Sequence, residues 1–177
     1  MRRVRYNVAA SLDGYIAAAD GSYDWIPEDS TIDFGALFAN VDTVLLGRTT
    51  WNEVVRQAGE RAWPAGSRIY VFSTTLRQHE HPDVTVVHGN AADVVAELRA
   101  EPGDGDIWLF GGGRLFSSLL AAGQVDRVEV TVVPVLLGGG TPLSVPGTSQ
   151  SPLRLVDTTR YQSGLVTLNY EVPGALR

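Results

Sequence analysis

Apolar and polar residues follow one another along this chain in short blocks with two different periods. Seven runs rich in Val, Ile and Leu are bounded by Gly, Pro, Asp or Ser, which is typical of β-strands. Apolar residues at helical spacing separate several of these runs. The predicted strands are residues 4–10, 43–46, 68–73, 84–87, 107–110, 127–136 and 166–172. The predicted helices are residues 33–40, 49–58, 91–100 and 115–122.

The alternation of strands with short helices predicts an α/β fold whose mainly parallel sheet is covered by helices on both faces. No helical pattern separates the last two long strands, so we expect them to pair antiparallel at one edge of the sheet. The longest irregular stretch, residues 11–30, has a length typical of loops over active sites. Because the chain has no repeats and no linker, we expect residues 1–177 to form one domain.

Composition narrows the class of protein. A net charge of −6 at pH 7 argues against binding to nucleic acid or acidic membranes. The absence of cysteine excludes thiolate metal sites, and "HEH" at 79–81 has no further ligands, so we expect no metal. The apolar run in "MRRVRYNVAASLDG" is too short for a secretion signal, and no stretch is long enough to span a membrane. We therefore expect a cytoplasmic enzyme or binding module for a small molecule.

Three loops that follow predicted strands have a composition suited to phosphate: "GRTTW" at 47–51, "STT" at 73–75 and "GGGRL" at 111–115. Ligands of parallel sheets bind at the carboxyl ends of the strands, where these loops lie. Arg48 and Arg114 stand at helix N-termini, where the helix dipole disfavours a cation unless an anion binds nearby. The glycines allow backbone N–H groups to approach a ligand closely. The pattern predicts a ligand with more than one phosphate, such as a dinucleotide.

Each loop also has a purely structural interpretation. Glycines suit tight turns, and hydroxyl side chains suit helix caps. This alternative applies to Gly47, Thr49, Thr50, Ser73, Thr74 and the glycines at 111–113. The chain has neither G-x-G-x-x-G after its first strand nor G-x-x-x-x-G-K-[ST], which excludes the standard Rossmann and P-loop sites.

Four motifs occur in order between residues 4 and 172: "AASLDGYIAAADGSYDW", "GRTTW", "GGGRLF" and "PVLLGGGTPL". The second and third resemble the paired cofactor motifs of dihydrofolate reductase. The first and fourth resemble the reductase domain of the bifunctional deaminase–reductase of riboflavin biosynthesis and its stand-alone homologues. The 177 residues contain no cysteine, so the zinc-binding pattern of the deaminase half is not found among them. The chain departs from this family at "PLSVPG", where Ser144 stands in place of a more frequent aromatic residue.

The resemblance implies a dihydrofolate-reductase-like three-layer α/β/α fold and NADPH as hydride donor across the ends of the central strands. It implies a cis peptide between Gly111 and Gly112, and a homodimer. It assigns the phosphates of the adenosine side to Arg48, Thr49 and Thr50, the 2′-phosphate ribose to Ser73 and Thr74, the pyrophosphate to Gly112, Gly113, Arg114 and Leu115, and the nicotinamide end to Ala9, Ala10, Ile16 and Ala17. Gly47 and Gly111 complete the same loops.

Three residues are candidates for the catalytic chemistry. Asp33 is similar in placement to the carboxylate that protonates the pterin in dihydrofolate reductases, but "STID" at 30–33 also fits a capping-box variant. Asp13 matches the family's "SLDG" loop near substrate and nicotinamide, and is equally a turn residue before a glycine. Trp25 resembles the tryptophan after the mobile loop of dihydrofolate reductases, or is a core aromatic. Asp24, Glu28 and Asp29 are further proton donors to consider.

The resulting hypothesis is an NADPH-dependent reductase that transfers a hydride to a C=O or C=N carbon of a small polar substrate, pterin-, pyrimidine- or ribosyl-like. The known enzyme that such a reductase would resemble is the 5-amino-6-(5-phosphoribosylamino)uracil reductase of riboflavin biosynthesis. The alternatives are dihydrofolate reductase proper, a non-catalytic nucleotide-binding module, and a protein with a flavin or another cofactor on the same fold. The long apolar run at 128–140 fits either a dimer interface strand or a core strand.

Overall fold

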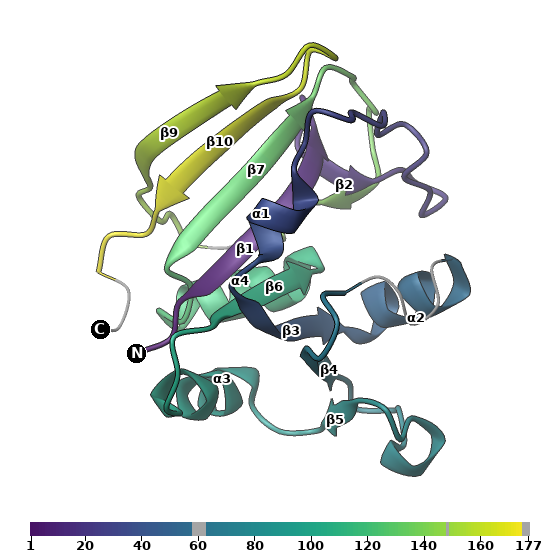
Figure 1. The fold of residues 1–177 in the computed structure, drawn as a ribbon. Coiled ribbons are helices and arrows are strands. Elements are labelled where there is room, and N and C mark those ends of the chain that lie inside the picture. The colour runs from purple at the N-terminus through teal and green to yellow at the C-terminus, as the bar shows by residue number, and fades with distance from the viewer. Residues whose placement is uncertain (58–62, 148, 175–177) are drawn as a thin grey trace.

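The computed structural model describes residues 1–57, 63–147 and 149–174, and its centre is one eight-stranded sheet in the order β5-β4-β3-β6-β1-β7-β10-β9 (Figure 1). From β5 to β7 every neighbouring pair is parallel, while β10 is antiparallel to both β7 and β9. The strands are β1 (Val4–Ser11), β3 (Val41–Gly47), β4 (Arg68–Phe72), β5 (Thr85–Val87), β6 (Asp106–Gly111), β7 (Arg127–Val133), β9 (Arg154–Arg160) and β10 (Val166–Glu171). The α/β fold with antiparallel C-terminal strands is confirmed.

Helices pack on both faces of this sheet. They are α1 (Phe34–Phe38), α2 (Arg48–Gln57), α3 (Ala91–Ala100) and α4 (Gly113–Ala121), with a short 3₁₀ turn η2 (Gln78–Glu80). On one face, Leu45 and Leu109 pack in a cluster with residues of α3 and α4. On the other face, Val44 and Trp108 pack with Phe38 of α1. Successive residues of β3 are thus buried on opposite faces, which explains its continuous apolar run.

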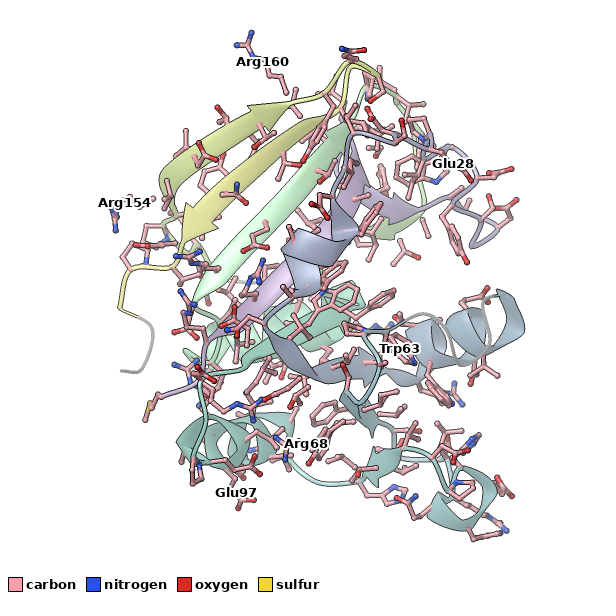
Figure 2. The ribbon with its side chains drawn as sticks, in the orientation of Figure 1. Glu28, Trp63, Arg68, Glu97, Arg154 and Arg160 are labelled. Carbon is pink, nitrogen blue, oxygen red and sulfur yellow. The ribbon has the colours of Figure 1, made fainter. Side chains whose placement is uncertain are left out.

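The main error of the sequence prediction is the strand β9. Every residue of Arg154–Arg160 is exposed, so the segment has no alternation of buried and exposed positions to reveal it. Figure 2 shows Arg154 and Arg160 projecting away from the molecule there. The pair β7–β10 is antiparallel as predicted but does not form the edge, because β9 lies outside it. The run at 128–140 therefore begins as an internal strand with partners on both sides.

Several boundaries also differ. The strand predicted to reach residue 136 ends at Val133, and the helix predicted from residue 115 begins at Gly113. The helix predicted over 33–40 is shortened to Phe34–Phe38. The helix predicted over 49–58 begins at Arg48, and residue 58 lies outside the described residues.

A small second sheet organises the predicted loop over 11–30. Its strands, β2 (Tyr15–Ala17) and β8 (Thr141–Pro142), are antiparallel, and the Leu143 N–H donates to the Gly14 carbonyl at 2.9 Å. Gly140 has a positive φ of 140°, and a Cβ there would overlap the carbonyl oxygen of Ala17. Only glycine lets these two segments pack so closely. None of the helices in the described part of the chain has the length and apolar composition needed to cross a bilayer.

Asp29 joins the loop before α1 to the turn between β9 and β10. Its carboxylate accepts hydrogen bonds from the hydroxyls of Ser163 and Thr31 and from the Thr31 N–H, the last at 2.9 Å. These bonds, with that of Ser163 the strongest, lower the pKa of Asp29 from 3.8 to about 2. A carboxylate with a depressed pKa stabilises the fold above its unfolded pKa, and this stabilisation is lost as pH falls through the folded value.

We therefore expect Asp29→Asn to lower the free energy of unfolding at neutral pH, with a difference from wild type that narrows as pH falls from about 4 toward 2. Urea denaturation of both proteins at about pH 6 and about pH 3 measures this difference. A difference that is the same at both pH values would contradict the assignment.

Candidate active site

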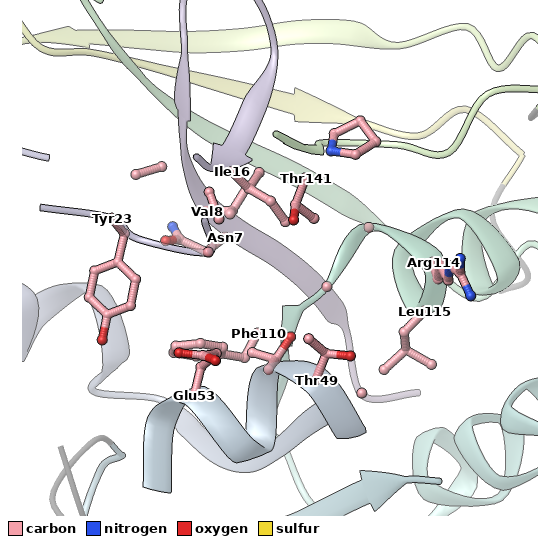
Figure 3. A pocket seen from close by; sticks show the side chains of 18 of the residues that line it. Asn7, Val8, Ile16, Tyr23, Thr49, Glu53, Phe110, Arg114, Leu115 and Thr141 are labelled. Carbon is pink, nitrogen blue, oxygen red and sulfur yellow. The ribbon is translucent and has the colours of Figure 1, made fainter. Parts of the chain in front are cut away.

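A cleft of about 1150 Å³ opens at the carboxyl ends of β1, β3 and β6 (Figure 3). The start of α2 and the start of α4 border it on two sides, and residues of β2 and β8 close a third. The volume exceeds that of a typical pocket for one drug-sized ligand, so the cleft has room for a dinucleotide and a small second molecule.

Most of the residues predicted to bind a cofactor meet in this cleft. They come from β1, β2 and the loops after β3 and β6, which are far apart in sequence. The members that line it are Ala9, Ile16, Ala17, Gly47, Arg48, Thr49, Thr50, Gly112, Gly113, Arg114 and Leu115. Two of the three predicted phosphate loops thus face one another, as the shared edge of a parallel sheet requires.

The start of α4 is suited to an anion. Gly112 precedes the helix without a side-chain cap, and neither α2 nor α4 has an acidic residue in its first turn. The first N–H groups of a helix have no acceptor within the helix. A Cβ on Gly112 would lie 3.3 Å from the Thr50 hydroxyl and 3.9 Å from the Ile16 side chain, so its absence keeps space for a ligand. The Gly111–Gly112 peptide is cis, as expected from the resemblance.

The third predicted loop is placed differently. The Ser73 hydroxyl is buried and accepts hydrogen bonds from the N–H groups of Thr75 and Leu76 at 3.1 and 3.0 Å, so it stabilises a turn. Thr74 is exposed, and neither residue is among those that line the cleft. The sequence placed Thr75 in this loop without giving it a role of its own, and its hydroxyl accepts a hydrogen bond from Arg48 at 3.1 Å. Arg48 therefore connects the loops after β3 and β4.

Two further predicted residues do not line the cleft. Ala10 is buried in the main core, and Gly111 is the buried last residue of β6.

The three candidate catalytic residues also lie outside the set that lines the cleft. Asp33 is the N-cap of α1 and accepts from the Ala36 N–H at 2.9 Å. The predicted cap at Ser30 is therefore wrong, because the helix starts three residues later and Asp33 itself caps it. Trp25 is half-buried, and its indole N–H donates to the Ser22 carbonyl at 3.2 Å.

Asp13 connects the turn after β1 to the segment before β8. Its carboxylate accepts from the Ser11 hydroxyl at 2.7 Å and from the N–H groups of Leu137 and Gly138 at 3.1 and 2.7 Å. These bonds, that of Ser11 first, hold the pKa of Asp13 below its ordinary value. A carboxylate that accepts three hydrogen bonds and stays ionised is suited to positioning its loop and not to donating a proton.

We expect Asp13→Ala to weaken binding of NADPH, the cofactor that the resemblance implies, by roughly threefold to tenfold, because loss of two or three exposed hydrogen bonds loosens the wall formed by β2 and β8. A fluorescence titration of both proteins measures the dissociation constant. Asp20→Ala is the matched control, since the Asp20 carboxylate accepts its hydrogen bonds within the described residues from Ser22 of the same loop. Equal affinities for wild type and Asp13→Ala would refute the positioning role.

The cleft has an aromatic end, away from the start of α4, which the sequence patterns did not reveal; it is formed by Phe34, Phe38, Trp108 and Phe110. Trp108 stacks on Phe38 with ring centroids 4.0 Å apart and contacts Phe110 at 4.9 Å. Tyr23, Phe34, Asn7 and Glu53 line the same cleft. In sequence these aromatic residues have the spacing of core positions: Phe34 and Phe38 one helical turn apart, Trp108 and Phe110 on one strand face. Their shared surface appears only when α1 packs on β6.

Comparison with protein families gives one match to most of the chain. The model of the RibD C-terminal domain matches residues 2–167. The uncharacterised Bacillus subtilis protein YwjB is 33% identical over 173 residues, covering 96% of this chain and 97% of its own. The riboflavin biosynthesis protein RibD of Mycobacterium tuberculosis H37Rv is 29% identical over 159 residues, covering 77% of this chain and 43% of its own.

Solved structures agree with this match. A Shewanella sp. PV-4 protein, assigned provisionally to riboflavin biosynthesis, superimposes with a TM-score of 0.81 at 29% identity and covers 97% of this chain and 99% of its own. Dihydrofolate reductase from Enterococcus faecalis, in complex with NADP(H), has a TM-score of 0.71 at 17% identity. It covers 97% of this chain and 96% of its own, a likeness that shows the fold.

Proposed function

This chain belongs to the RibD C-terminal domain family, and on that premise we propose that it is an NADPH-dependent reductase acting on a C=O or C=N carbon of a small ring compound. The observation that carries the proposal is the meeting of two helix starts, each with an arginine and without an acidic residue, in one large cleft. Two such starts suit a ligand with phosphate at two separate places, such as the pyrophosphate and the adenosine-side phosphate of NADPH. We further propose that residues 1–177 act as one cytoplasmic reductase domain.

The proposed orientation of the cofactor follows the lining residues. Arg48, Thr49 and Thr50 would hold phosphate on the adenosine side, with Ser73, Thr74 and Thr75 in the neighbouring loop. Gly112 to Leu115 would hold the pyrophosphate against the start of α4. Ala9, Ile16 and Ala17, with Ala10 next to Ala9 in β1, would contact the nicotinamide: the three line the same cleft, and Figure 3 shows Ile16 between the start of α4 and Tyr23.

NADPH supplies a hydride from its nicotinamide ring, and the protein supplies orientation and a dry surface. The aromatic end of the cleft would hold the acceptor beside the nicotinamide and exclude water from it. Among the described residues, Glu53 is the carboxylate that lines the cleft, and we propose it as the group that supplies the proton. Asp13, Asp33 and Trp25 would act by holding the surrounding loops in place.

A titration with NADPH and with NADH, followed by tryptophan fluorescence, tests the proposal. Trp108 lines the cleft, so a bound nicotinamide alters its emission. The expected result is binding of NADPH that is at least about tenfold tighter than binding of NADH. Binding of neither cofactor would refute the proposal. Tight binding with no turnover of any carbonyl or imine acceptor would favour a nucleotide-binding module instead.

We also propose a homodimer formed through β9. Among the described residues this strand has no partner on its outer side, and Leu155 and Val156 are 52% and 51% exposed. An unpaired edge that carries apolar side chains is a site of association. In sedimentation velocity we expect wild type to be a dimer and Val156→Lys to be a monomer. A monomeric wild type at about 50 µM would contradict this arrangement.

A further inference from the structure

A buried charged network lies beneath the aromatic end of the cleft. The Glu129 side chain is only 5% exposed and receives a bidentate pair of hydrogen bonds from Arg5, both at 2.9 Å. Arg5 also donates to Asp106 at 3.2 Å and to the carbonyl of Leu37 at 3.3 Å. The network therefore connects β1, β6, β7 and the end of α1. Buried ion pairs of this kind fix geometry more than they add stability.

The network fixes the orientation of one side chain in the cleft, that of Asn7. The Asn7 amide nitrogen donates to Glu129 at 2.9 Å. An ionised carboxylate only accepts hydrogen bonds, so it must face the NH₂ group of Asn7 and not its oxygen. The carbonyl oxygen of the amide therefore points away from Glu129, and within the described residues no group donates to it. Asn7 lines the cleft, on the side of Tyr23 (Figure 3).

The neighbouring indole is held in a similar way. The Trp108 N–H donates to the backbone carbonyl of Asn7 at 3.3 Å, which leaves the ring without a free donor. Trp108 stacks on Phe38 and contacts Phe110, so this end of the cleft offers aromatic surface and, at Asn7, an amide oxygen of fixed orientation. A planar heterocycle with a ring N–H satisfies both features, because it can stack on the aromatic residues and donate to the amide.

We propose that Asn7 is the specificity-determining residue for the acceptor: its carbonyl oxygen accepts a hydrogen bond from a ring N–H of a planar heterocycle. Glu129 and Arg5 are positioning residues, since they act through Asn7. The inference rests on the proposed function only in assigning this end of the cleft to the acceptor. A substrate whose ring nitrogens are alkylated is then a poor ligand, because the amide oxygen is left without a partner.

A matched pair of ring compounds tests the assignment without knowledge of the substrate. Lumazine has ring N–H donors, and 1,3-dimethyllumazine has the same rings without them. We expect wild type to bind lumazine about tenfold more tightly than the dimethyl compound, measured by fluorescence with NADPH present. In Asn7→Leu, which keeps the volume and removes the amide, the two affinities should become equal. In Glu129→Gln the preference for lumazine over the dimethyl compound should fall, because the Asn7 amide can then rotate by about 180° and exchange its oxygen and nitrogen.

Three results would overturn the proposal: equal binding of both compounds by wild type, a preference that persists in Asn7→Leu, or no binding of lumazine at about 1 mM. A persistent preference would mean that the methyl groups clash elsewhere. If the role of Asn7 were purely structural, Asn7→Leu would weaken the binding of both compounds by the same factor. NADPH binding, measured in the same samples, separates this test from the proposed function: its absence in wild type refutes the reductase, whatever the lumazine pair does.

Discussion

Arg48→Ala is expected to weaken NADPH binding by about 10- to 100-fold. Arg48 is the exposed first residue of α2, where a cation is mildly unfavourable in the absence of an anion. Its hydrogen bond to the Thr75 hydroxyl, at 3.1 Å, holds the guanidinium between two of the predicted phosphate loops. A hydrogen bond between charged groups contributes about 1.5–3 kcal/mol, which corresponds to this range of affinity.

Isothermal titration calorimetry measures the loss, and two comparisons make it specific. Arg160→Ala removes an exposed arginine from β9, far along the sheet order from β3, and should leave NADPH affinity unchanged (Figure 2). The free energy of unfolding of the unliganded Arg48→Ala protein should be unchanged or slightly higher, because the mutation removes a charge that opposes the helix dipole. If the Arg48→Ala protein binds NADPH with the same affinity as wild type, Arg48 does not contribute to the cofactor site.

Gly113→Ala is expected to lower the free energy of unfolding by about 2–3 kcal/mol and to abolish tight NADPH binding. Gly113 is the first residue of α4, and a Cβ there would overlap the carbonyl oxygen of Pro142 and lie 3.0 Å from that of Leu143. These are backbone atoms of β8 and the residue after it, so no side-chain rotation relieves the overlap. Either α4 or the β2–β8 wall must move, and both border the cleft.

Urea denaturation and an NADPH titration of the same samples measure the two effects. Gly89→Ala is the matched control, because a Cβ at Gly89 meets nothing within 4 Å; we expect its effect to stay within about 0.5 kcal/mol. A Gly113→Ala protein with wild-type stability and wild-type affinity would show that the contact between α4 and β8 does not shape the cleft.

The two loops that border the cleft at the starts of α2 and α4 could be located from the sequence because their signals are local. A glycine at a strand end, an arginine at a helix start and the missing first-turn acid all lie within a few residues of one another, as at Gly47 and Arg48. The hydroxyl that contacts Arg48 belongs to Thr75 in another loop, and no local pattern distinguishes it from Ser73 or Thr74. A turn hydroxyl and a ligand-binding hydroxyl have the same sequence signature.

The aromatic end of the cleft could not be predicted, because its parts are brought together by tertiary packing. Asn7 and Glu129 are 122 residues apart, and their hydrogen bond depends on the parallel pairing of β1 with β7. Phe38 and Trp108 have the periodicity of buried residues; Trp108 is buried and Phe38 half-buried, and both also line the cleft. The strand β9 was not predicted because its residues are too little buried. All of them are exposed, on both faces of the strand, so the period of two on which strand prediction depends is lost.

Hydrogen–deuterium exchange with and without NADPH tests most directly whether this cleft is the cofactor site. We expect protection of backbone amides in three segments, residues 15–18, 47–53 and 111–116, because these border the cleft from β2, α2 and α4. Residues 64–69 and 80–84, which line a smaller pocket of about 410 Å³ beside Trp51, should be unaffected. Protection confined to that smaller pocket, or no protection at a saturating concentration of NADPH, would contradict the account.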